Sequence, residues 1–407
     1  MDLTVAGPGI VCMMPNQKER QQIIQVEPVP APVDQSPADP APGLSGGSSR
    51  TACAAYARVR RYLDLPRVGE PLGRSIEMDA LRGLAILLVV LGHAIANSAN
   101  LYQVSTYNPQ YYVSSFIYTF HIPLFFLVSG YVLFGRRVRI GDRAIRLLLP
   151  FLAWIPVYWA ANRYIRHFPW PVRFWPTVKD TLLHPGAGLW FLPVLFLCSM
   201  LLIPVIFLEK RWTWAGEISL LVIFVAVNLI PFDDVGVVQV KYFFAFFALG
   251  YLAAKHRTRL REILGKNINI ILAGLSSLFL VLFTVLYYYG RSYSLALPFT
   301  IHDLFKTPGA YLIRYVMALL GIIACVALIR SFKTTRARTV FAWFGLVTME
   351  IYVSHGLLLQ LTFGSGWLKV LVSFATGVFL PLALAFLILR KWWFTGALFY
   401  GINPDKE

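Results

Sequence analysis

Long apolar runs recur along most of this 407-residue chain, and they restrict its fold more than any other feature. Many of them reach about 18 residues or more, the length that a helix needs to cross the hydrocarbon core of a bilayer. Hydrophobic residues make up 57% of the chain and charged residues only 14%, a composition that argues against a soluble enzyme. We therefore predict an all-α, polytopic membrane helical bundle.

The apolar runs predict ten transmembrane helices with both termini in the cytoplasm. The predicted spans are 80–98, 113–134, 144–162, 189–208, 217–232, 238–254, 268–288, 310–329, 340–362 and 367–389. Eighteen Lys and Arg residues fall in the segments predicted to be cytoplasmic and six in the opposite loops, which supports this orientation. The fifth and sixth spans are the least clear, because Pro231, Asp233 and Asp234 leave little room for a connection.

The net charge of +17 does not indicate a nucleic-acid partner, because the cations cluster in short segments between apolar runs. The four cysteines are scattered and have neither CxxC nor metal-site spacing, so we expect no disulfide framework and no metal.

Three domains are expected along the chain. Residues 1–74 are rich in Pro, Gly and Ser and predict a disordered cytoplasmic tail without a cleavable signal peptide. Residues 75–395 form the transmembrane domain, and residues 396–407 form a cytoplasmic C-terminal tail.

Two ionisable residues share one face of the first predicted span. Arg82 and His93 are eleven residues apart, which is three helical turns plus roughly 20°, and the rise between them is roughly 16 Å. Arg82 therefore lies near a membrane surface and His93 toward the middle of the bilayer. Asp79, three residues before Arg82, is expected to orient its guanidinium. An ionisable group at that depth indicates function. The alternative is a histidine that only packs against a neighbouring helix.

The second and third spans carry further candidates. His121 is a second intramembrane histidine, for which a packing role is an equal alternative, and Pro123 is expected to kink its helix. Gly130 on the same span is expected to allow a close helix approach. Arg143 and Arg146 lie three residues apart on one helix face, where paired guanidinium groups suit phosphate. A positive-inside loop explains the arginines just before them.

Five motifs occur in order on the predicted spans. They are Asp79-Ala80-Leu81-Arg82-Gly83 with His93, Phe120-His121-Ile122-Pro123-Leu124-Phe125-Phe126 with Ser129-Gly130-Tyr131, Arg143-x-x-Arg146 with Pro150, Leu189-Trp190-Phe191-Leu192, and Glu350-Ile351-Tyr352-Val353-Ser354-His355-Gly356. In this combination the chain resembles the acyltransferase 3 family of integral membrane O-acyltransferases, over roughly residues 75 to 390. It looks like a stand-alone form without the extra esterase-like domain of some relatives, similar to exopolysaccharide or oligosaccharide acetyltransferases.

The resemblance implies a function and a location. It implies transfer of an acyl group, usually acetyl, from cytoplasmic acyl-CoA to a hydroxyl of an extracytoplasmic or lipid-linked polysaccharide or oligosaccharide. The partners are then the lipid bilayer, acyl-CoA as donor substrate and a carbohydrate acceptor. No permanently bound cofactor is expected. The resemblance also implies a multi-pass protein located in the bacterial inner membrane.

The resemblance and the residues together assign the predicted site. Arg82, Arg143 and Arg146 bind the negatively charged acyl-CoA, and His93 takes the proton from the acceptor hydroxyl. Glu350 orients or pairs with His93, or is a structural carboxylate, and His355 lies one turn further outward on its span as a third catalytic residue. His121 and Trp190 are assigned to the acceptor, although Trp190 also fits an interfacial aromatic belt.

Two other classes remain open from the sequence. A transporter or flippase for a glycan-type substrate also buries ionisable residues, and a membrane scaffold or sensor needs only a few paired polar groups. Cytoplasmic arginines aligned with a buried histidine favour the enzyme.

Overall fold

The computed structural model describes residues 75–98, 108–164, 173–183, 189–232, 234, 236–288, 308–332, 334–359 and 361–402. All regular elements in these ranges are helices, so the all-α class is confirmed for the described residues. The predicted tail 1–74 and residues 403–407 of the predicted tail 396–407 lie outside these ranges, and the domain boundaries stay predictions.

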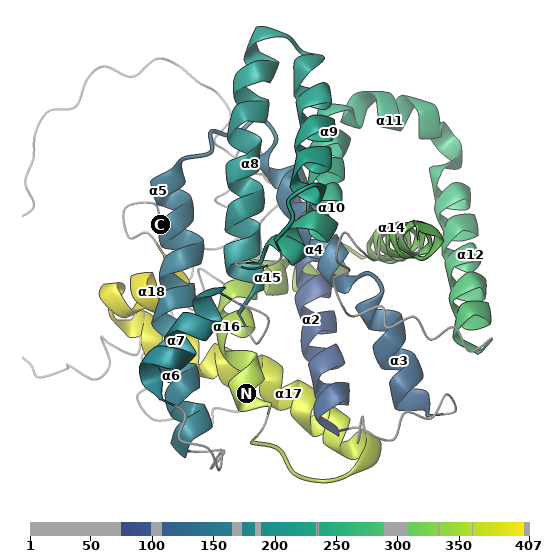
Figure 1. Cartoon of the computed structure of the whole chain (residues 1–407). Helices are drawn as coiled ribbons and strands as arrows, with labels where there is room; N and C mark the ends of the chain where they lie inside the picture. Colours follow the sequence, from purple (N-terminus) through teal and green to yellow (C-terminus); the bar gives the residue numbers. More distant parts are fainter. Residues whose placement is uncertain are drawn as a thin grey trace, which may run out of the picture. The chain divides into compact units, whose positions relative to one another are not determined.

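Within the described ranges, eight helical segments are long and apolar enough to cross a membrane, and they confirm a polytopic bundle (Figure 1). The segments are α2 (Ile76–Ser98), α3 with α4 (Pro109–Tyr118 and His121–Leu133), α5 with η2 and α6 (Ile140–Arg143, Ala144–Leu148 and Leu149–Tyr164), α8 (Phe191–Arg211), α10 (Val237–Lys255), α11 with α12 (Arg257–Leu264 and Ile268–Tyr288), α14 (Pro308–Ser331) and α17 (Gly366–Leu387).

Two predicted spans differ from simple straight crossings. The predicted span 340–362 is two helices, α15 (Thr335–Leu346) and α16 (Thr348–Leu358), which meet at an angle of 70°. The predicted fifth span is the short α9 (Ala215–Asn228) of 14 residues. It ends before Pro231, because a proline disfavours helical backbone in the residue that precedes it.

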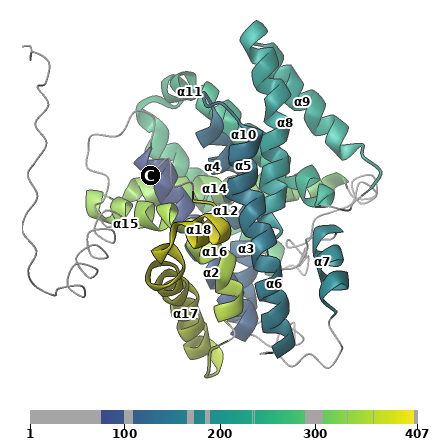
Figure 2. The ribbon, with the colours of Figure 1, turned by 90° about the vertical axis from the view of Figure 1, so that its left-hand side faces the viewer.

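α2 lies at the centre of the bundle. It packs against α15, α17, α4, α3, α14 and α16, which come from both halves of the chain (Figures 1 and 2). Ala80, Ala85, Val90 and Ala94 are wholly buried along it, so its small and apolar residues let several neighbours approach at once. Neighbouring helices therefore surround the face of α2 that carries Arg82 and His93.

A pair of glycines brings α2 and α15 into backbone contact. A β-carbon on Gly83 would lie 1.8 Å from the carbonyl oxygen of Phe341, and one on Gly345 would lie 2.0 Å from that of Asp79. Only glycine fits at such a distance. The close approach fixes the helix end that carries Asp79 next to the bend between α15 and α16.

The predicted close approach at Gly130 is confirmed, and its partner is α10. A β-carbon on Gly130 would lie 1.9 Å from the carbonyl oxygen of Phe247, and one on Gly250 would lie 1.9 Å from that of Leu127. The two glycines are therefore reciprocal, each receiving the backbone of the other helix.

We expect Gly130→Ala to destabilise the protein strongly, because the new methyl group overlaps the rigid backbone of α10. The cost should exceed the 1–3 kcal/mol typical of overpacking with side chains. Thermal unfolding in detergent measures it. Gly274→Ala is the matched control, since a β-carbon there meets nothing within 4 Å. Its melting temperature should stay level or rise slightly. Equal melting temperatures for the two variants would contradict the tight α4–α10 contact.

Candidate active site

Arg82 and His93 occupy one face of α2, as the spacing predicts. Arg82 is also held by Asp79, whose carboxylate lies 3.7 Å from its guanidinium, so the predicted orienting pair is confirmed. His93 has an exposed side chain although its neighbours Gly92 and Ala94 are buried. The imidazole therefore lies deep among protein atoms, next to the rings of Tyr118 and His355, with part of its surface still accessible.

His355 lies beside His93, although 262 residues separate them in the chain. The centroids of the two imidazole rings are 5.2 Å apart, in an edge-on arrangement. His355 is buried and comes from α16, the second half of the bent pair. Because of the bend, α16 carries a second imidazole to a position beside His93.

His121 is the third histidine of the group that His93 and His355 form. It begins α4, because the span breaks at Thr119 and Phe120, just before Pro123. The predicted kink is thus present, since a proline ring clashes with the carbonyl four residues earlier. The ring of Tyr118 lies next to the rings of both His121 and His93.

The three imidazoles share one tautomer. Nδ1 of His93 is 2.9 Å from the carbonyl oxygen of Val89, and Nδ1 of His121 is 2.8 Å from that of Ile117. Nδ1 of His355 is 2.7 Å from the carbonyl oxygen of Tyr352.

A carbonyl oxygen can only accept, so each Nδ1 carries the proton and donates it. Each Nε2 then holds a lone pair and can act as a base. The Nε2 of His121 is buried and has no hydrogen-bond partner among the described residues.

Tyr118 was missed by the sequence reasoning and lies between two of the histidines. Its ring centroid is 6.2 Å from that of His93 and 4.9 Å from that of His121. A β-carbon on Gly92 would lie 3.1 Å from this ring, so the glycine makes room for it. A tyrosine in an aromatic-rich span carries no pattern that separates it from a packing residue.

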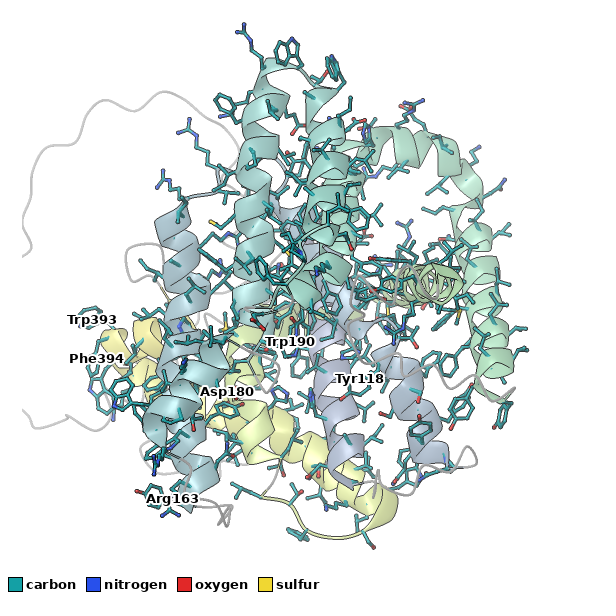
Figure 3. All side chains as sticks on the ribbon, in the orientation of Figure 1. Tyr118, Arg163, Asp180, Trp190, Trp393 and Phe394 are labelled. Atoms are coloured by element: carbon teal, nitrogen blue, oxygen red, sulfur yellow. The ribbon has the colours of Figure 1, made fainter. Side chains whose placement is uncertain are left out.

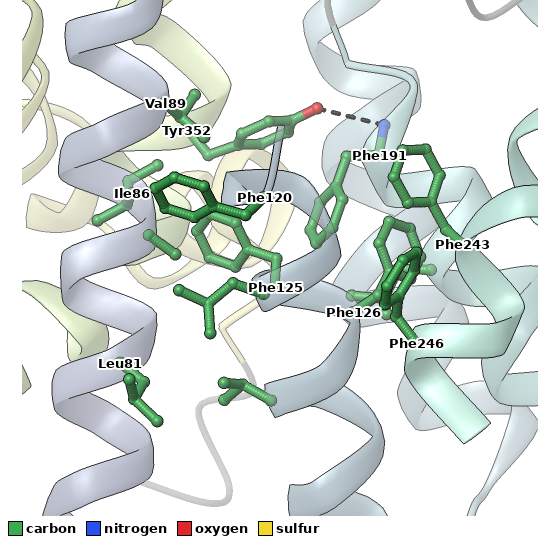
Figure 4. Packing of buried hydrophobic residues seen from close by; sticks show 14 of the residues in the cluster. Leu81, Ile86, Val89, Phe120, Phe125, Phe126, Phe191, Phe243, Phe246 and Tyr352 are labelled. Atoms are coloured by element: carbon green, nitrogen blue, oxygen red, sulfur yellow. Dashed lines mark hydrogen bonds between the residues drawn. The ribbon is translucent and has the colours of Figure 1, made fainter. Parts of the chain in front are cut away.

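Trp190 lies at the start of α8, near the middle of the bundle with Tyr118 (Figure 3). Its ring stacks on Phe243, with centroids 5.4 Å apart. The next residue, Phe191, donates its backbone N–H to the hydroxyl of Tyr352 at 3.3 Å (Figure 4). The ring of Tyr352 is 6.0 Å from His355, so this hydrogen bond connects Trp190 with the histidine group.

The predicted donor arginines gather at one place. The positive charges of Arg146, Arg82 and Arg136 all act on the guanidinium of Arg143. Arg143 ends α5, and Arg146 lies in the π-helix η2 that follows it. Two separate segments thus supply a concentrated positive charge, which suits a multiply charged phosphate ligand.

The C-terminal helix α18 (Trp393–Tyr400) packs against the segment that carries Arg146. Gly401 has φ +63°, and a β-carbon there would lie 2.6 Å from the Cα of Arg146. Trp154 of α6 donates its indole N–H to the carbonyl oxygen of Phe399 at 3.0 Å. Sequence patterns gave no indication of this contact.

Glu350 forms an ion pair with Arg390 and lies in the first turn of α16. A guanidinium nitrogen is 2.6 Å from the carboxylate, and both side chains are largely buried. The pair joins α16 to the segment after α17. Burial and the nearby Glu350 carboxylate raise the pKa of the Tyr400 hydroxyl, so Tyr400 stays neutral beside the pair. The catalytic assignment of Glu350 stays a prediction.

His, Cys, Asp and Glu side chains of the described residues form no group that could hold a metal ion. The chemistry that the described side chains offer is that of three imidazoles, with a group of arginines that begins at Arg82, a rise of roughly 16 Å along α2 from His93.

Comparison with known proteins gives one family and two similar relatives. A family model described as an acyltransferase domain matches residues 75–390. Nodulation protein NolL of Mesorhizobium japonicum is 26% identical over 327 residues, which cover 74% of this chain and 83% of the relative. The protein of the same name in Sinorhizobium fredii is 26% identical over 327 residues, covering 75% of this chain and 85% of the relative. No solved structure matches the chain.

The family match has the limits predicted for the resemblance, residues 75 to 390, and includes every predicted site residue. It covers well over half of the chain. This protein therefore belongs to the acyltransferase 3 family and is an integral membrane O-acyltransferase.

Proposed function

We propose that this O-acyltransferase moves an acetyl group from cytoplasmic acyl-CoA to a hydroxyl of an extracytoplasmic or lipid-linked polysaccharide or oligosaccharide. The observation that carries the proposal is the exposed imidazole of His93, on the same helix face as Arg82 and next to His355. The location that follows is the cell membrane, with the donor side in the cytoplasm.

The donor side of the proposal rests on charge. The nucleotide end of acyl-CoA carries several negative charges, and Arg82, Arg143 and Arg146 supply positive charge at one place. The thioester lies at the far end of a long, thin arm. Arg82 and His93 share one face of α2, with a rise of roughly 16 Å between them. An arm that extends along this face from Arg82 therefore leads toward His93.

The chemistry follows from the tautomer of His93. Its Nε2 takes the proton of the acceptor hydroxyl while the hydroxyl oxygen attacks the thioester carbonyl. The carbon–sulfur bond then breaks, the CoA thiolate leaves, and the proton on Nε2 passes to that thiolate. Nδ1 keeps its proton throughout, because it donates to the carbonyl of Val89.

The remaining residues have supporting roles in this proposal. His355 lies close enough to His93 for both imidazoles to contact the same acceptor hydroxyl. The lone pair of the His355 imidazole is on Nε2, as it is in His93. His121 and Trp190 contribute to the acceptor side.

Consumption of the donor tests the proposal. Purified protein in detergent receives acetyl-CoA, with and without glycan isolated from the cell surface, and free thiol is measured. Glycan-dependent release of CoA, together with a mass increase of one acetyl group on the glycan, is expected. Glycan transport into vesicles without any release of CoA would favour a transporter or flippase instead.

We expect Arg143→Ala and Arg146→Ala each to weaken acetyl-CoA binding. A charge-assisted hydrogen bond contributes roughly 1.5–3 kcal/mol, which corresponds to a loss of affinity of about 10- to 150-fold. Equilibrium binding of acetyl-CoA to the purified protein measures the loss. Arg137→Ala is the matched control, because Arg137 is an exposed arginine of the same connection. If all three variants bind as tightly as the wild type, the two arginines only orient the chain in the membrane.

A further inference from the structure

α11 and the first half of α12 form an L-shaped surface that differs from the rest of the bundle. α11 lies across the end of the bundle where α10 ends and α12 begins (Figure 1). The chain turns between the two helices at Gly265, whose φ of +50° is a conformation that glycine adopts most easily. α11 and α12 therefore run in different directions from this turn (Figure 1).

The α11 arm is basic and amphipathic. Residues 257–266 contain Arg257, Arg259, Arg261 and Lys266 with one carboxylate, Glu262.

None of the eight residues of α11 is buried. Leu260 and Ile263, which are three residues apart and so share a face, are 40% and 71% exposed. Orientation by positive charge explains the arginines but does not require an exposed apolar face. A basic helix with such a face lies in the headgroup region of a membrane.

The α12 arm has no fully buried residue along its first half, where Leu275 only partly packs against the core. The buried residues of α12 are Phe279, Phe283 and Tyr287, all in its second half. There it is held by α14 and by Tyr112, whose hydroxyl is 2.9 Å from that of Thr284. The apolar turns nearest to α11 have no buried residue, and Ile270 is 75% exposed.

We infer that this L-shaped surface is a binding site for an anionic phospholipid. Charge complementarity identifies the ligand, because the phosphate of the headgroup meets the arginines of α11. The acyl chains lie along the exposed first turns of α12. A zwitterionic lipid offers the same chains without the net charge, so it should bind more weakly.

Lipid titration followed by native mass spectrometry of the detergent-purified protein tests this inference. Phosphatidylglycerol should bind more tightly than phosphatidylcholine of the same chain length. Each basic residue near the surface changes affinity by about fivefold, so the triple variant R257Q/R259Q/R261Q should bind phosphatidylglycerol on the order of 100-fold more weakly. Its binding of phosphatidylcholine should change little.

A matched control removes the same number of exposed charges elsewhere. In K210Q/R211Q/K391Q, the affinity for phosphatidylglycerol should stay within about twofold of the wild type. Equal losses in the two triple variants would overturn the inference, since only overall charge would then matter. If the α11 variant does not fold, Arg259→Gln alone should still lower the affinity by about fivefold.

Two further outcomes would also overturn it. Full competition by free glycerophosphoglycerol would mean that the arginines bind phosphate without the acyl chains. A stable dimer that dissociates in Ile270→Asn without any change in lipid binding would mean that a second copy of the chain covers α12.

Discussion

Replacing His93 by alanine is expected to lower acyl transfer by roughly 10²–10⁴-fold, the usual contribution of a positioned general base. Acetyl-CoA binding should persist, because Arg82 and its neighbouring arginines are unchanged. His93→Gln should be about as inactive as the alanine variant, since an amide keeps a hydrogen bond but takes no proton. Transfer is measured as glycan-dependent CoA release, beside equilibrium binding of the donor.

The pH dependence gives a second measure of the same role. A general base acts in its neutral form, so the wild-type rate should rise with pH as the imidazole loses its proton, provided that chemistry limits turnover. His256→Ala is a matched control, because this histidine, between α10 and α11, pairs at 2.9 Å with Glu217 of α9, and none of these helices carries a predicted catalytic residue. Near-normal transfer by His93→Gln would leave His93 as a packing or orienting residue. A thermal melt in detergent shows whether each variant is folded.

Glu350→Ala is expected to destabilise the protein by about 3–5 kcal/mol, because it leaves the charge of Arg390 buried without its carboxylate. Arg390→Ala should cost a similar amount for the reciprocal reason. Unfolding in detergent measures both changes. Lys391→Ala is the matched control, since Lys391 is exposed and adjacent to Arg390 in the chain.

The exchanged pair separates a structural role of Glu350 from a catalytic one. The double variant Glu350→Arg with Arg390→Glu restores opposite charges and should recover part of the lost stability. If Glu350 only holds α16 in place, transfer should return together with stability. A stable double variant without transfer would instead support the catalytic assignment of the carboxylate itself.

Several features of this protein were predictable because they depend only on local geometry. The rise and rotation of a helix place Arg82 and His93 on one face, and Asp79 three residues before Arg82 forms the expected ion pair. The same holds for the apolar lengths of most spans and for the break before Pro123. The order of the motifs also identified the family, over nearly the limits that its model matches.

The predicted sidedness of the termini and the roles of the site residues remain predictions. The sequence assigned roles to His355, Glu350 and Trp190 but did not determine their neighbours. The structure places His355 against His93, whereas Glu350 pairs with Arg390, forty residues away in the chain.

Only the tertiary structure decided which helices meet. The bend of 70° between α15 and α16 brings His355 to His93, and Tyr118 lies between His93 and His121. The physical reason is that the backbone hydrogen bonds of a helix form within one segment, so its faces can be derived from spacing alone. Contacts between helices depend on how side chains and glycine gaps of distant segments fit together, and no single segment contains that information.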